Sequence, residues 1–229
     1  MKLVSVVSVL RKHYGKPAPP LTRDPFELVL LENAAYLVDD ARRRATWEAL
    51  RDAVGFDPPR IAAMHVARLA RVLRGGGMLP EHRARKVQKA AHVALERFGG
   101  RVKSVLSMPA ADAKRALQRF PSIGEPGADK ILLLTRTAPV LALDSNALRV
   151  LVRLGFERER KQYSATYRAM QAAIAGDLKK DYRWLAEASD LLRRHGQTLC
   201  KRTKPLCDAC PLAKECPSSS ATMLRRRVP

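Results

Sequence analysis

The stretch from Ala110 to Arg136, AADAKRALQRFPSIGEPGADKILLLTR, decides the fold of this chain. Two segments with the apolar spacing of helices flank a short turn, FPSIG, at residues 120–124. Pro126 suits the first turn of the second helix, where its missing N–H is not needed. Such a turn aims backbone N–H groups outward at a helix start, where they bind phosphate without a particular side chain. An ordinary pair of antiparallel helices has the same pattern, so both interpretations stay open here.

The rest of the sequence also has the pattern of helices. Ala, Leu and Arg dominate, apolar residues recur every three or four positions, and no alternating strand pattern occurs. Repeated breaks at Gly and Pro indicate that the helices are short and several. We therefore expect an all-α fold, and the 229 residues suffice for one or two modest cores.

The chain is strongly basic, with 43 Lys and Arg against 22 Asp and Glu and a formal net charge of +21. No apolar run approaches the roughly 20 residues that span a bilayer, and no signal peptide is evident. A polyanion is the simplest partner, and nucleic acid fits it, although an arginine-rich proteome would raise the charge as well. We expect a cytoplasmic protein with no membrane contact.

All four cysteines lie near the end of the chain in the pattern C-x6-C-x2-C-x5-C: Cys200, Cys207, Cys210 and Cys216. Four thiolates in one short stretch, with no histidine among them, can enclose a single soft metal centre. Ligand type does not separate an iron–sulfur cluster from tetrahedral zinc, although zinc ribbons usually pair two C-x2-C knuckles. Disulfides fit less well, because a small secreted scaffold would carry more cysteines per residue.

Asp144 stands between an apolar stretch and the next predicted helix, in ALDSNALRV at residues 142–150. Its simplest role is an N-cap, for which Asp, Ser and Asn are favoured. Capping is compatible with chemistry, because a carboxylate at a helix start has a fixed position and a favoured charged form.

In this order, the hairpin, Asp144 and the cysteines resemble the helix-hairpin-helix DNA glycosylase superfamily, in its endonuclease III and adenine and mismatch glycosylase branch. The turn at residues 120–124 resembles the family's Leu-Pro-Gly-Val-Gly, with Ser122 replacing the first glycine. Asp144 follows Pro126 by 144 − 126 = 18 residues, the spacing between the family's lysine and its catalytic Asp. The loop from Cys200 to Cys216 resembles the family's four-iron four-sulfur loop. The resemblance thus implies a 4Fe-4S cluster, with zinc as the alternative.

The same resemblance implies which residues touch double-stranded DNA. In the family, the basic loop between the first two cysteines faces the DNA backbone. The segment at residues 78–80 precedes a match to the helix that follows the duplex-probing loop, so it is the candidate wedge for the space left by a flipped base. The candidate DNA contacts are Ser122, Gly124, Lys130, Met78, Leu79, Lys201, Arg202 and Lys204.

Glu32 aligns with the glutamate that adenine and mismatch glycosylases carry on the helix lining the base pocket. A glutamate in so apolar a run is costly to bury unpaired, so it is otherwise a helix-edge residue that reaches solvent or an Arg. Tyr36 is a candidate to stack on an extruded base, or equally a core residue. The resemblance implies that Asp144 stabilises the charge on the sugar and orients water, while Glu32 supplies a proton or hydrogen bond to the leaving base.

Bifunctional members carry a lysine where this chain has Pro126, which has no amine to form a Schiff base. We therefore predict a monofunctional, hydrolytic glycosylase of base excision repair. One alternative is a bifunctional glycosylase and lyase that uses Lys130, one helical turn further on. The alternative from another class is a catalytically silent DNA-binding or lesion-sensing protein.

The resemblance also implies two helical domains that flank a DNA-binding cleft. One is a six-helix-type bundle over residues 23–132, which ends in the helix-hairpin-helix. The other joins residues 1–22 to 133–216 and holds the cluster, and residues 217–229 form a basic tail that we expect to be disordered. We expect the protein to act as a monomer at the nucleoid.

Overall fold

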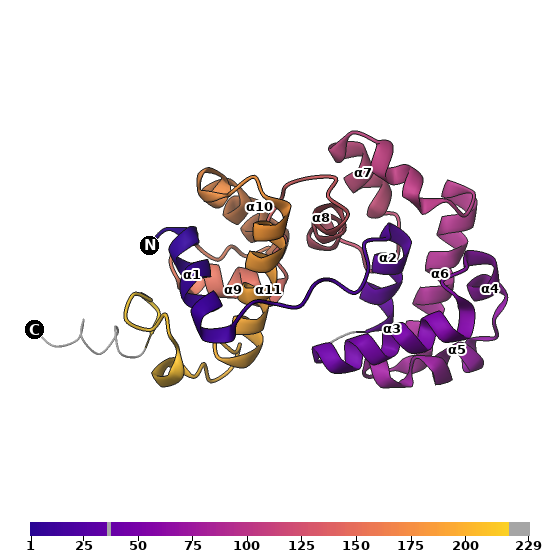
Figure 1. The fold of residues 1–229 in the computed structure, drawn as a ribbon, viewed down its shortest axis with the longest axis horizontal. Helices are drawn as coiled ribbons and strands as arrows, with labels where there is room; N and C mark the ends of the chain where they lie inside the picture. The colour runs from indigo at the N-terminus through magenta and orange to yellow at the C-terminus, as the bar shows by residue number, and fades with distance from the viewer. Residues whose placement is uncertain (36–37, 220–229) are drawn as a thin grey trace, which may run out of the picture. The chain divides into compact units, whose positions relative to one another are not determined.

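The computed structural model describes residues 1–35 and 38–219. Every regular element in these residues is an α-helix or a short 3-10 helix, so the predicted all-α class is confirmed. Backbone contacts divide the chain into two compact units. Figure 1 shows the helices, with the colour running from the N-terminus to the C-terminus. Unit 1 consists of Met1–Pro19 and Pro139–Pro229, and unit 2 is Pro20–Ala138.

Unit 2 has seven α-helices within its described residues: α2 (Pro25–Ala34), α3 (Asp40–Val54), α4 (Pro58–Ala63), α5 (Val66–Val72), α6 (Pro80–Phe98), α7 (Ala110–Leu117) and α8 (Glu125–Leu134). Two 3-10 turns, η1 (Arg74–Gly76) and η2 (Val102–Ser107), lie between them. Aspartates set three of the helix starts: Asp24, Asp39 and Asp57 each accept hydrogen bonds from the first backbone N–H groups of α2, α3 and α4.

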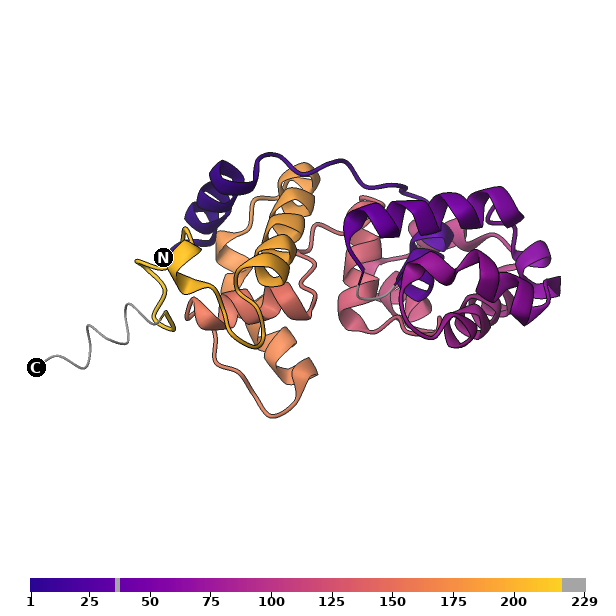
Figure 2. The same cartoon turned by 90° about the horizontal axis from the view of Figure 1, so that it is seen from below.

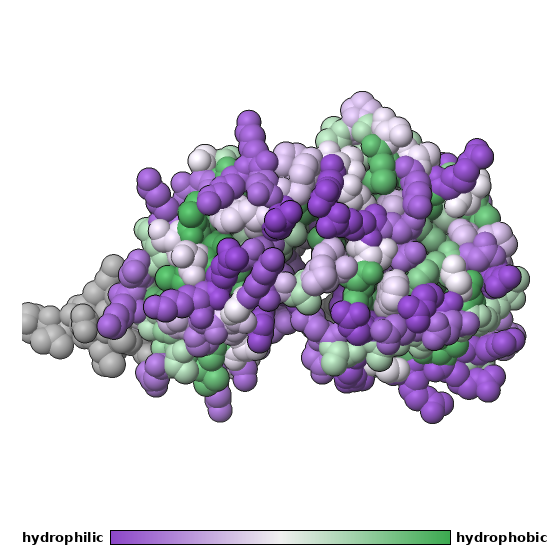
Figure 3. Space-filling model, in the orientation of Figure 1, coloured by the Kyte–Doolittle hydropathy of each residue, from purple (hydrophilic) through white to green (hydrophobic). Residues whose placement is uncertain are grey.

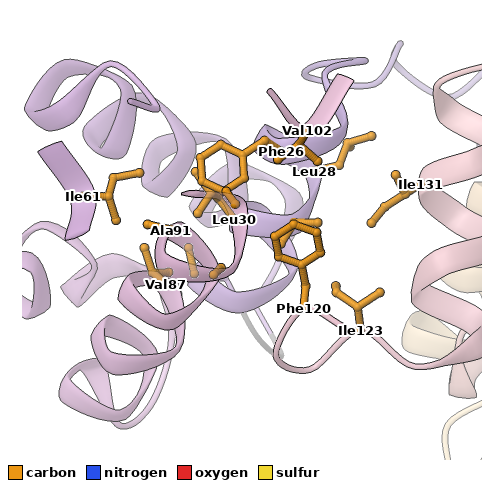
Figure 4. Close-up of a cluster of buried hydrophobic side chains, with 14 of the residues drawn as sticks. Phe26, Leu28, Leu30, Ile61, Val87, Ala91, Val102, Phe120, Ile123 and Ile131 are labelled. Atoms are coloured by element: carbon orange, nitrogen blue, oxygen red, sulfur yellow. The ribbon is translucent and has the colours of Figure 1, made fainter. Parts of the chain in front are cut away.

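One hydrophobic cluster holds unit 2 together. Helix α6 contributes a stripe of small buried residues, including Ala90 and Ala91, which lets neighbouring helices approach closely. The turn between α7 and α8 inserts Phe120 and Ile123 into the same cluster, beside Ile131 of α8 (Figure 4). The predicted hairpin is therefore a fixed part of the core.

The hairpin turn keeps a left-handed residue although it lacks a glycine there. Ser122 has φ of +61°, a conformation that costs a residue with a Cβ about 1–2 kcal/mol. Pro126 lies in the first turn of α8, as the sequence predicts. Side-chain burial on both flanks of the turn holds it in this strained geometry.

Unit 1 has four α-helices within its described residues: α1 (Leu3–Tyr14), α9 (Ser145–Arg153), α10 (Tyr163–Ile174) and α11 (Tyr182–Thr198), with 3-10 turns η3 (Ala175–Asp177) and η4 (Cys207–Ala209). Although α1 begins the chain, it packs on α11, and Figures 1 and 2 show the two together. The Tyr14 hydroxyl lies 3.0 Å from His195 Nδ1. Helices α9 and α11 cross so closely that a Cβ at Gly196 would lie 2.6 Å from the Asn146 carbonyl oxygen.

Hydrophilic side chains are widespread on the face of the molecule in Figure 3. Among the described helices, none is long and apolar enough to cross a membrane. Two apolar side chains of unit 2 are unusually exposed, Met78 at 76% and Leu79 at 70%. Both belong to the segment predicted to be the wedge.

Candidate functional site

The Glu32 carboxylate is the centre of a charge cluster in unit 2. Its Oε1 accepts hydrogen bonds from Lys130 Nζ of α8 at 2.7 Å and from Arg43 Nη2 of α3 at 2.5 Å. Burial would raise the pKa of Glu32, but the two cations outweigh it and lower the pKa to about 2. Glu32 is therefore ionised at neutral pH.

This environment differs from the one expected for a proton donor. In this structure the Glu32 carboxylate is an acceptor of hydrogen bonds from two cations. Lys130, expected to face phosphate, directs its ammonium group at Glu32 instead, with its side chain one-third exposed. Tyr36, the candidate stacking residue, lies outside the described residues.

Asn33 ties the Glu32 helix to the hairpin. Its side chain is buried, and its Nδ2 donates to the Pro121 carbonyl and to the Val29 carbonyl, both at 2.9 Å. Asn33 thus holds the turn that contains Ser122 and Gly124 against α2. Sequence reasoning did not select this residue, because its only signal is an amide within an apolar run.

In unit 1, Asp144 caps α9 and is thereby held in one orientation. Its Oδ1 accepts hydrogen bonds from the backbone N–H groups of Asn146 at 3.0 Å and Ala147 at 2.8 Å. Its Oδ2 accepts one from Asn146 Nδ2 at 3.1 Å. Asp144 is half-buried. Burial and the charge of Asp144 raise the pKa of Tyr163, at the start of α10, to about 12.

A chain of hydrogen bonds links Asp144 to the cysteine loop. Asn146 Oδ1 accepts from Arg149 Nη2 at 2.9 Å, and the same Nη2 donates to the Gly196 carbonyl at 2.7 Å. Arg149 Nε donates to the Cys200 carbonyl at 3.0 Å. Arg149 was not selected from the sequence, because its partners are 3, 47 and 51 residues away.

All four cysteines line one cavity, together with apolar residues such as Val150 and Leu212. Arg153 Nη1 lies 3.3 Å from Cys200 Sγ, and His195 Nε2 lies 3.5 Å from Cys210 Sγ. Within the described part of the chain, no three His, Cys, Asp or Glu side chains gather closely enough to hold a single metal ion. Four soft donors around one cavity are a ligand set for an iron–sulfur cluster or for a single soft metal ion.

The basic loop after Cys200 has a fixed backbone and exposed side chains. Arg153 donates from Nη1 to the Lys201 carbonyl at 2.7 Å and from Nη2 to the Arg202 carbonyl at 3.1 Å. The side chains of Lys201, Arg202 and Lys204 reach solvent. The loop is thus a preformed cationic surface.

No family model matches the chain. It is similar to the Endonuclease III of Rickettsia conorii, with 29% identity over 102 residues, which cover 44% of this chain and 45% of that protein. The chain thus spans less than half of the length of that relative. The Endonuclease III of Treponema pallidum is 28% identical over 189 residues, which cover 82% of this chain and 81% of that protein.

Two solved structures have the same fold. A trapped Endonuclease III–DNA covalent intermediate has a TM-score of 0.74 at 21% identity and covers 99% of this chain and 100% of that chain. A thermostable thymine-DNA glycosylase has a TM-score of 0.71 at 17% identity, with 96% and 97% covered. The likeness extends over both units.

Proposed function

We propose that this chain, which belongs to the helix-hairpin-helix DNA glycosylase superfamily, is a DNA N-glycosylase of base excision repair that removes a damaged or mispaired base from duplex DNA. The observation that carries the proposal is the Asp144 carboxylate, which three hydrogen bonds hold at the start of α9. Endonuclease III relatives and thymine-DNA glycosylase relatives on the same fold support the reaction class.

Asp144 would act on the sugar. Cleavage of the glycosidic bond builds positive charge there, and a carboxylate with a fixed position stabilises that charge and orients the attacking water. General acid–base contributions of this kind are about 10² to 10⁴-fold. Asp144→Asn should therefore lose base release by at least about 100-fold and still bind duplex DNA. Asn is also a good N-cap, so α9 should persist.

The matched control for Asp144→Asn is Asp39→Asn. Asp39 caps α3 in unit 2 in the same way, with its Oδ1 accepting from the Arg42 N–H at 2.8 Å. The control should keep full base release. Equal losses in the two variants would mean that Asp144 only caps.

The leaving base takes up negative charge, which a cation beside it would stabilise. We infer that Lys130 is the cation that stabilises the leaving base. Glu32 holds the ammonium group of Lys130 in place through the 2.7 Å ion pair. Glu32 is then a positioning residue for Lys130, with Arg43 balancing its charge. This role replaces the proton donation inferred from the sequence.

The same ion pair favours a monofunctional reaction. Lys130 Nζ donates to the Glu32 carboxylate at 2.7 Å, so the amine would have to leave this ion pair before it could attack a sugar. The family position for the nucleophile is Pro126, which has no amine. The expected product is a free base and an abasic strand that stays intact until alkali or heat is applied.

The test is a base-release panel with borohydride trapping. Duplexes carry uracil, thymine opposite guanine, hypoxanthine, and alkylated and oxidised bases, and release and nicking are measured separately. Nicking that accompanies release, with a trapped adduct that is lost in Lys130→Ala, would overturn the hydrolytic assignment and make Lys130 the nucleophile. Neither release nor nicking on any duplex would favour a silent DNA-binding protein.

For DNA contact we propose the hairpin amides around Ser122 and Gly124 together with the exposed cations of the cysteine loop. Helix N-termini bind phosphate through their unpaired N–H groups and dipole, and the loop adds three positive side chains. Met78 and Leu79 would fill the space of the flipped base.

We also propose that Cys200, Cys207, Cys210 and Cys216 hold a 4Fe-4S cluster. All four cysteines line one cavity, and the resemblance of their loop to the 4Fe-4S loop of the endonuclease III branch favours a cluster over zinc. A bound cluster would cross-link the loop and so stabilise the cationic surface. Iron analysis of anaerobically purified protein tests this, and stoichiometric zinc without iron would contradict it.

A further inference from the structure

We infer that Arg83 is a positioning residue that holds the exposed segment Gly77–Leu79 in the shape needed to enter a DNA duplex. The inference rests on the proposed function, since only a duplex gives this segment a target. Arg83 lies in the first turns of α6 and is 4% exposed. Its guanidinium donates to four backbone carbonyls: Met78 at 2.9 Å, Leu73 at 2.7 Å, Ala34 at 2.5 Å and Gly77 at 2.6 Å.

Arg83 is a buried cation that no carboxylate neutralises among the described residues. Burial, with a smaller effect of Arg42, lowers the pKa of Arg83, but an arginine stays charged at neutral pH. Burying such a charge is costly, and an apolar side chain of similar size would fill the space without that cost. The four charge-assisted hydrogen bonds offset part of this cost. They also fix the positions of the carbonyl groups that accept them.

Two of these carbonyls belong to the segment that displays the apolar side chains. Arg83 holds the Gly77 and Met78 carbonyls, and the next residue, Leu79, has φ of 53° and ψ of 59°. The left-handed conformation costs a residue such as leucine about 1–2 kcal/mol and persists only where the surroundings enforce it. The result is two apolar side chains held in water, 76% and 70% exposed. This arrangement is unfavourable in the free protein and useful when the side chains replace a base in the stack.

The other contacts connect the same guanidinium to the helix that carries Glu32. Ala34, whose carbonyl accepts from Arg83 Nη1, is two residues after Glu32 in α2. Gly76 closes this arrangement, because a Cβ there would lie 2.5 Å from Arg83 Nη1 and would overlap the Ala34 carbonyl oxygen. One side chain thus fixes the position of the wedge relative to the base-side charge cluster within unit 2. Base extrusion and base capture need such a fixed spacing.

The test is a double-mutant cycle on the preference for an abasic site. Affinity is measured for an intact duplex and for the same duplex with a tetrahydrofuran abasic analogue. The proteins compared are wild type, Arg83→Lys, a wedge variant in which Met78 and Leu79 are both replaced by Ala, and the combination of the two changes. Lysine keeps the charge but cannot reach four carbonyls. We expect Arg83→Lys and the wedge variant each to reduce the preference about tenfold, and their combination to be no worse than the wedge variant, because Arg83 acts through Met78 and Leu79.

Gln88→Ala is the matched control. Gln88 also lies on α6, and its Nε2 donates to the carbonyls of Ala62 and Met64 at the end of α4. It should lower the stability of unit 2 without changing the abasic preference. Should Arg83→Lys not fold, Arg83→Gln, whose neutral amide keeps two N–H donors, should give the same selective loss.

Three outcomes would overturn the inference: equal loss of affinity for both duplexes, a further loss of preference when Arg83→Lys is added to the wedge variant, or no abasic preference in the wild type. These are distinct from a failure of the proposed function. A protein that removes no base but shows an Arg83-dependent preference through Met78 and Leu79 would retain the positioning role. A protein that removes a base while its Arg83 variants lose both affinities equally would refute the positioning role alone.

Discussion

Glu32→Gln removes the charge that Lys130 and Arg43 share and keeps the shape of the side chain. The pKa of Glu32 falls from its ordinary value of 4.5 to about 2 in the folded protein. At roughly 1.36 kcal/mol per pKa unit, this difference corresponds to about 3 kcal/mol of stability from the ionised carboxylate. The substitution also removes the negative charge from the two ion pairs of Glu32, so we expect a loss of about 2–3 kcal/mol at neutral pH.

The loss should depend on pH with a definite sign. A lowered pKa means that the folded state binds the Glu32 proton more weakly than the unfolded chain does. The stabilisation is therefore fully present above about pH 4.5 and disappears as the pH falls toward about 2. The difference in unfolding free energy between wild type and Glu32→Gln should be constant from pH 7 to about pH 5 and should shrink below that range.

Fluorescence can assign this effect to unit 2. The two tryptophans are Trp47 in α3 and Trp184 in α11, so urea unfolding in a Trp184→Phe background reports on unit 2 through Trp47. The control is Glu81→Gln, which removes a carboxylate that is 65% exposed and 3.5 Å from Arg85 and should cost less than about 0.5 kcal/mol. A loss no larger than that of the control, or one unchanged between pH 7 and pH 3, would refute the account of the Glu32 cluster.

Three further predictions concern unit 1. In the first, Lys201, Arg202 and Lys204 are replaced together by Ala. The slope of log affinity against log salt concentration should become shallower by about 0.9 for each phosphate that the loop no longer neutralises. An unchanged slope would show that the loop does not face DNA. Cys210→Ser should abolish iron binding and lower the melting temperature of unit 1, which is measured by Trp184 fluorescence. The melting temperature reported by Trp47 in unit 2 should not change. Gly196→Ala should destabilise unit 1 by about 1–3 kcal/mol, because the new methyl group would press on the Asn146 carbonyl, and a neutral result in urea unfolding would contradict the close approach of α9 and α11.

Several features could be predicted from the sequence because they depend on near neighbours. The hairpin follows from a turn between two apolar helical segments with a proline in the second helix, and the structure confirms it at residues 117–125. Asp144 was expected to cap a helix, and it accepts from N–H groups two and three residues away. The all-α class follows from periodicity for the same reason, since helical hydrogen bonds join residues four apart.

The electrostatic roles could not be predicted in this way. Glu32 lies 98 residues from Lys130 and 11 from Arg43, and only the folded chain brings both cations within 2.7 Å of its carboxylate. Sequence separation says nothing about that distance, whereas the Coulomb energy depends on it directly.

The same holds for Asn33 and Arg83, which the sequence shows only as an amide in an apolar run and a cation on a basic helix. Their partners, Pro121 for Asn33 and Ala34 for Arg83, lie 88 and 49 residues away. The sequence by itself determined the helices, the turn and the cysteine quartet, because these depend on bonds and spacings within a few residues. Only the tertiary structure decided which polar groups are paired, since a buried donor takes whichever carbonyl or carboxylate the packed helices bring to it.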